Sequence, residues 1–164
     1  MILGGSVLRV FSPGTAQYLR PVLEGLGLDA LASLRDEGMF REWFEAALNG
    51  VAGAILLQNA DNPKVQPGYK WGHGTKVLNL FLREVVVNSR YFSEADAKRL
   101  EYWLHVPVDG IIMARLRDLG FQPQYWAIKE LTREDFYHIQ QALGEAAAKV
   151  GVPRVWFDDI WAWQ

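Results

Sequence analysis

The stretch TKVLNLFLREVVV, residues 75–87, decides what kind of fold this chain can adopt. A helix built from it carries apolar side chains on nearly every side, and such a helix is normally buried inside a protein. Three of its polar side chains, Lys76, Asn79 and Arg83, recur at intervals of three and four residues and therefore form one stripe. We expect residues 75–87 to be a central helix whose polar stripe faces a cleft or the edge of the molecule.

The rest of the chain also has a helical pattern. Ser93 with Asp96, and Thr132 with Asp135, are typical of side-chain caps at two helix starts. Only Val7–Phe11 has the character of a strand. Residues 59–73 contain several Pro and Gly and indicate an irregular loop. The expected helices are one from Pro13 to the glycines at 25 and 27, one at 40–48 that resumes at 51–58, and those at 75–87, 94–104, 110–119 and 133–149.

The length and composition exclude several classes of protein. The chain has 164 residues, the length of one domain, and we see no repeat or linker, so residues 1–164 are expected to form one compact all-α domain. Its 17 Lys and Arg against 19 Asp and Glu give a net charge of −2, which excludes a polybasic nucleic-acid binder. The absence of cysteine excludes disulfides, thiolate zinc sites and a cysteine nucleophile.

No cofactor or metal is expected, because the three histidines, His73, His105 and His138, lack metal-ligand spacing. The longest apolar or small stretch, Val51–Leu57, is far shorter than the roughly 20 residues that span a bilayer. We therefore expect a soluble, cytoplasmic monomer that does not bind a membrane. If it acts on DNA, we expect a prokaryotic, nucleoid-associated protein.

The near-neutral total charge hides a basic middle segment. Between Lys64 and Arg99 there are seven basic and three acidic residues, a local charge of +4. Residues 24–45 have six acidic and two basic residues, a local charge of −4. This pattern fits either scattered surface charge or a surface for a polyanion.

Two short motifs flank the stripe-bearing helix in the sequence. Gly72, His73, Gly74 and Thr75 stand directly before its N-terminus, where free backbone N–H groups can hold a phosphate. Farther on, Val106-Pro107-Val108 leads into Asp109, which is placed to cap the helix that begins at Gly110. Taken singly, Lys76 reads as an exposed lysine of a first helical turn and Asp109 as a simple cap.

In combination, the string Gly-His-Gly-Thr-Lys at 72–76 and the turn Val-Pro-Val-Asp at 106–109 resemble the helix-hairpin-helix DNA glycosylases. The likeness is greatest to the 8-oxoguanine glycosylases, and the 33-residue separation of Lys76 from Asp109 resembles the archaeal type. It covers Trp71 to Leu119. The hairpin position usually held by Pro is Trp71 here.

The resemblance implies a helix-hairpin-helix-like element and a chemistry. Lys76 would be the nucleophile that attacks C1′ and forms a Schiff base, with Asp109 stabilising the developing positive charge. The substrate would be double-stranded DNA with a damaged or modified purine such as 8-oxoguanine, flipped out of the stack, with or without AP-lyase activity. The residues considered for the base pocket are Trp71, Asn79, Arg83, Trp126, Trp156 and Phe157.

Two other functions stay open at this point. The first is a non-enzymatic helical nucleic-acid-binding or interaction module that uses the basic middle segment. The second is a ribonuclease, because Arg99 and His105 resemble the Arg-x(4 to 6)-His motif of the HEPN ribonucleases. A short distance between Lys76 Nζ and an Asp109 carboxylate oxygen favours the glycosylase hypothesis, whereas placement on opposite sides of the domain excludes it.

Overall fold

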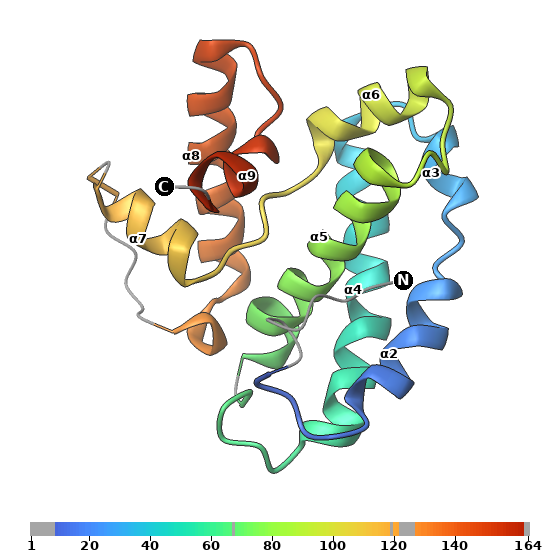
Figure 1. Cartoon of the computed structure of the whole chain (residues 1–164), viewed down its shortest axis with the longest axis vertical. Helices are drawn as coiled ribbons and strands as arrows, with labels where there is room; N and C mark the ends of the chain where they lie inside the picture. Colours follow the sequence, from blue (N-terminus) through green and yellow to red (C-terminus); the bar gives the residue numbers. More distant parts are fainter. Residues whose placement is uncertain (1–8, 67, 119, 122–126, 163–164) are drawn as a thin grey trace.

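The computed structural model describes residues 9–66, 68–118, 120–121 and 127–162, and this part of the chain is all-α (Figure 1). No strand occurs in these ranges. No described helix is long and apolar enough to cross a membrane. The elements are α2 (Thr15–Glu24), α3 (Asp29–Ser33), α4 (Glu37–Asn59), η1 (Tyr69–Gly74), α5 (Thr75–Arg83), η2 (Glu84–Asn88), α6 (Glu94–Trp103), α7 (Gly110–Asp118), η3 (Ile128–Glu130), α8 (Arg133–Val150) and α9 (Trp156–Ala162).

Both predicted helix caps are confirmed. The Ser93 side chain accepts from the backbone N–H of Asp96 at 3.1 Å, and the Thr132 side chain accepts from that of Asp135 at 3.2 Å. These contacts start α6 and α8 where the sequence indicated. Gly151, with φ 72°, ends α8 in a left-handed conformation that suits glycine.

Several elements differ from the expectation. The segments at 40–48 and 51–58 belong to one continuous helix, α4, which begins after Asp36 because this carboxylate accepts from Met39 N at 2.8 Å. Helix α2 begins at Thr15, not at Pro13, since Gly14 has φ 90° and interrupts the helical path. The strand expected at Val7–Phe11 is wrong for its described part, because residues 9–11 form turns and a bend; residues 7 and 8 lie outside the described residues.

The loop expected at residues 59–73 ends earlier than predicted. Tyr69–Gly74 forms a π-helical turn, η1, which runs directly into α5, so the glycines at 72 and 74 are helical. This turn also makes a close tertiary contact. A Cβ at Gly68 would lie 1.5 Å from the carbonyl oxygen of Lys129, and a Cβ at Gly72 would lie 1.7 Å from that of Ile128. Only glycine permits this approach of two backbones.

The core forms around α4 and α5. The predicted burial of the helix that begins at Thr75 is confirmed, because Val77, Leu78 and Leu82 are fully buried. Phe44 of α4 stacks on Phe136 of α8 with ring centroids 6.0 Å apart. One hydrophobic cluster therefore extends from the N-terminal helices to α8.

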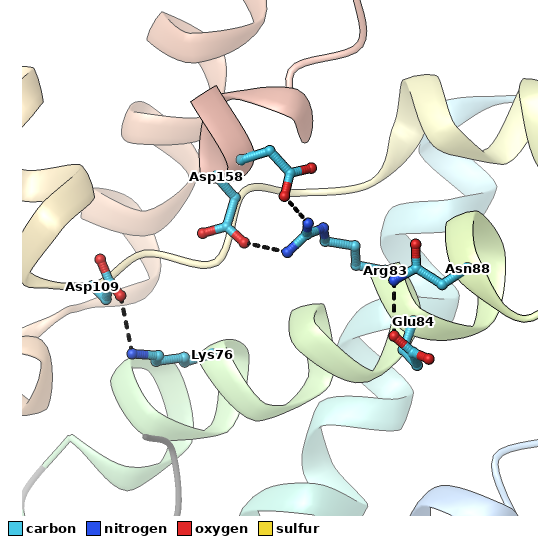
Figure 2. Close-up of polar contacts among 7 residues, drawn as sticks. Lys76, Arg83, Glu84, Asn88, Asp109 and Asp158 are labelled. Atoms are coloured by element: carbon cyan, nitrogen blue, oxygen red, sulfur yellow. Dashed lines mark hydrogen bonds and ion pairs between the residues drawn. The ribbon is translucent and has the colours of Figure 1, made fainter. Parts of the chain in front are cut away.

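Figure 1 shows α2 to α6 on one side of the molecule and α7 to α9 on the other. The segment from Leu104 to Asp109 crosses between the two groups. Its path is held by Gln140, whose side-chain amide exchanges two 2.8 Å hydrogen bonds with the backbone N–H and C=O of Val106. This crossing carries Asp109 to the N-terminal end of α5 (Figure 2).

Candidate functional site

Lys76 and Asp109 meet between the first turn of α5 and the start of α7. The Lys76 Nζ donates to Asp109 Oδ2 at 3.1 Å (Figure 2). The side chains are 18% and 26% exposed, so the pair is partly shielded yet open to solvent. The two residues that carry the sequence motif, 33 positions apart, are therefore in direct contact.

Asp109 also caps α7, as the sequence indicated. Its Oδ1 accepts from the backbone N–H groups of Ile111 at 2.9 Å and Ile112 at 3.1 Å. One carboxylate oxygen is therefore held by the helix, while the other faces Lys76. This division orients the carboxylate without using the oxygen that contacts the amine.

The second end of the polar stripe is occupied by the C-terminal helix. The Arg83 guanidinium donates to Asp158 at 2.7 Å and also to Asp159, and both carboxylates belong to α9 (Figure 2). Helix α9 packs on α7, and this ion pair also joins it to α5. Sequence reasoning missed these contacts, which join positions 75 and 76 residues apart, because no local pattern encodes such a pairing.

The charges of this region nearly cancel. Lys76 and Arg83 contact three carboxylates, those of Asp109, Asp158 and Asp159. Burial raises the pKa of Asp158; Arg83 acts against this, and the negative charge of Asp109 adds to it. The stripe is therefore not the cationic surface that the basic middle segment suggested.

Asn79 lies on the same helix between the two ion pairs, one turn after Lys76. It is only 2% exposed. Neither its Nδ2 nor its Oδ1 has a hydrogen-bond partner among the described residues. A buried amide with both groups unpaired is unusual and costs free energy, so it is a candidate polar contact for a bound molecule.

The proposed phosphate-binding residues, Gly72, His73, Gly74 and Thr75, are all buried. The N–H groups of Gly72 and His73 donate to Gly68 O at 2.8 and 3.4 Å, and that of Thr75 donates to Gly72 O. These N–H groups are not free because the segment is helical and the backbone of residues 128–129 covers it. The expected phosphate site is therefore not formed in this conformation.

His73 is an uncharged residue of this covered turn. Burial, together with the nearby charges of Lys76 and Lys129, lowers its pKa to about 4. Its ring packs edge-on against Phe11 at 5.7 Å, and its Nδ1 has no partner among the described residues. His73 therefore contributes packing and not positive charge.

The aromatic pocket candidates that lie among the described residues do not gather around Lys76. Trp71 packs against Phe136 and Tyr137, with ring centroids 6.4 and 6.2 Å away. The Trp156 indole donates to Glu101 of α6 and is 42% exposed. Phe157 stacks on Trp161 at 4.8 Å. Trp126 lies outside the described residues.

The ribonuclease pair Arg99 and His105 has separate surroundings. Arg99 donates to the carbonyl of Ala32 at 2.8 Å and pairs with Asp96 at 2.9 Å. His105 is enclosed by aromatic rings and lines a cavity of about 710 Å³ between α4 and α8. Burial holds the pKa of His105 well below its usual range. The structure thus does not bring this pair together.

Among the described residues, no group of three or more His, Cys, Asp or Glu side chains could hold a metal ion. Compared with protein-family models, with curated protein sequences and with solved structures, this chain finds no match in any of the three. What the geometry offers chemically is an amine and a carboxylate in contact, a buried unpaired amide beside them, and an ion pair that closes the far end.

Proposed function

We propose that this protein is a lysine-dependent DNA N-glycosylase that removes a damaged or modified purine such as 8-oxoguanine. The observation that carries the proposal is the 3.1 Å contact between Lys76 Nζ and Asp109 Oδ2. An amine beside a helix-oriented carboxylate is suited to attack a sugar carbon at which positive charge develops. The resemblance of residues 71–119 to the 8-oxoguanine glycosylases supports the same assignment.

In the proposed reaction Lys76 Nζ, having lost its ammonium proton to solvent, attacks C1′ of the damaged nucleotide. The bond from C1′ to the purine nitrogen breaks, its electron pair leaves with the base, and the base takes up one of the two protons of the amine nitrogen. The Asp109 carboxylate stabilises the positive charge at C1′. Opening of the sugar ring transfers the remaining amine proton to the ring oxygen and leaves an imine between C1′ and Nζ. AP-lyase activity would follow by elimination of the 3′ phosphate.

Borohydride trapping tests this proposal directly, because it reduces the imine to a stable amine. We expect a covalent adduct between the protein and a duplex that contains 8-oxoguanine, and no adduct with Lys76→Gln. Lys98→Gln, which changes an exposed lysine of α6, is the matched control and should form the adduct as the parent does.

An adduct that persists in Lys76→Gln would rule out Lys76 as the nucleophile. If no duplex with an oxidised or alkylated purine gives an adduct, while duplex DNA still binds, the non-enzymatic nucleic-acid-binding module replaces the glycosylase. A duplex with a preformed abasic site separates lyase activity from base removal.

A further inference from the structure

A second polar region lies at the start of α8, against η1. An open cavity of about 460 Å³ lies there. Its walls carry three cations and two carboxylates, whereas the region of Lys76 and Arg83 has two cations against three carboxylates. The cavity is lined by Gly68, Lys70, Trp71, Lys129, Glu130, Leu131, Thr132, Arg133 and Glu134.

The cations of this cavity differ in how far they are already paired. Arg133 bonds Glu45 at 2.6 Å, so its charge is largely neutralised. Lys129 Nζ donates to the carbonyl of Pro63 at 3.1 Å, which is a neutral partner. Lys70 lies 5.7 Å from the Trp71 ring and is exposed. Lys70 and Lys129 have no acidic partner among the described residues, and they are the charges available to a ligand.

The same contact that closes the glycine turn creates this cavity. The backbone of Ile128 and Lys129 covers Gly68 and Gly72, so the N–H groups of the turn cannot reach a phosphate. It also brings the Lys129 side chain to the cavity that Lys70 lines. The groups that can contact an anion here are therefore side chains and not the backbone N–H groups of the turn.

We propose that Lys70 and Lys129 bind the phosphate backbone of duplex DNA at this surface, which we call the η1–α8 surface. The proposal rests on DNA being the partner in the proposed function. Since η1 continues directly into α5, Lys70 precedes Lys76 by six residues on one continuous helical segment. A strand held at the η1–α8 surface has its neighbouring nucleotides within reach of Lys76 and Asp109.

The test is the salt dependence of binding to an undamaged duplex, measured by fluorescence anisotropy. Each phosphate contact contributes about 0.9 to the slope of log K against log salt concentration. We expect Lys70→Gln and Lys129→Gln each to lower this slope by about 1 and to weaken binding about 3- to 10-fold at low salt. Lys70→Arg and Lys129→Arg should retain the parental slope because they keep the charge.

Lys98→Gln, on α6, is the matched control and should leave the slope unchanged. Glutamine variants that bind with the slope of the parent and of this control would overturn the proposal, as would a parent that does not bind duplex DNA. Thermal melting of each variant shows that it is folded. A changed slope together with no borohydride adduct would refute the glycosylase and leave the η1–α8 surface standing, so the two failures are distinguishable.

Discussion

Asp109 combines two tasks that a single-residue view of the sequence treats as alternatives. Its Oδ1 caps α7, and its Oδ2 contacts Lys76. The cap alone would explain an Asp at this position, because Asp and Asn are both favoured there. The two tasks differ in their need for charge. A neutral amide can cap a helix, but it lacks the negative charge that stabilises a cation.

Replacement of Asp109 therefore allows the cap to be separated from the chemistry. Asp109→Asn should keep the free energy of unfolding within about 0.5 kcal/mol, whereas Asp109→Ala should lower it by about 1 kcal/mol. Both variants should form the borohydride adduct about 100-fold more slowly than the parent. Urea unfolding and the rate of adduct formation check the two effects. An Asp109→Asn variant with the parental adduct rate would reduce Asp109 to a cap.

At the scale of elements, α5 is the helix on which the candidate site is assembled. Its apolar faces are buried as the periodicity predicts, and its polar stripe meets two helices from the C-terminal part of the chain. Lys76 contacts the residue before α7, and Arg83 contacts α9. Helix α9 has only 7 residues, so its position depends on contacts of this kind and not on its own helical stability.

A double-mutant cycle measures how strongly α9 is held to α5. For Arg83→Gln with Asp158→Asn we expect a coupling free energy of about 1 to 2 kcal/mol, because both side chains are largely shielded, 22% and 18% exposed. For Arg83→Gln with Asp159→Asn we expect less than about 1 kcal/mol, because Asp159 is 52% exposed. Equal couplings for the two carboxylates would contradict this distinction.

For the whole molecule, two buried histidines link stability to pH. His73 is 4% exposed and His105 is 3% exposed, and burial lowers the pKa of both. The unfolded chain therefore binds more protons than the folded chain between the ordinary histidine pKa of 6.5 and the lowered values. The contribution of these uncharged histidines to the free energy of unfolding is therefore fully present above about pH 6.5. It is lost as the pH falls toward 4, because the unfolded chain takes up the protons first.

We expect the free energy of unfolding to decrease between pH 7 and pH 5, by up to about 1.4 kcal/mol per pH unit for each histidine within its window. His105→Phe extends an aromatic cluster and should remove the contribution of His105 to the pH dependence of the free energy of unfolding. His73→Phe should remove the contribution of His73. Denaturant unfolding at several pH values measures the free energy of unfolding of each variant and of the parent. The contributions of the carboxylates cancel in the difference between the two. Parental slopes in both variants would assign the pH dependence to other groups.

The sequence by itself determined the all-α class, the burial of α5, and the starts of α6 and α8. These features depend on side-chain periodicity and on caps between residues three apart, which are local interactions. It also pointed to Lys76 and Asp109, through motifs confined to a few residues each. The continuous helix α4 was only partly predicted, because its cap at Asp36 precedes the apolar pattern.

Only the tertiary structure decided how these parts meet. The backbone of Ile128 and Lys129 lies against Gly68 and Gly72 and covers the turn, which is helical and not the loop that the glycines predicted. Arg83 is neutralised by carboxylates 75 and 76 residues away. Such contacts join segments that have no local pattern in common, so their geometry follows from the packing of the whole chain and not from the motif that surrounds each residue.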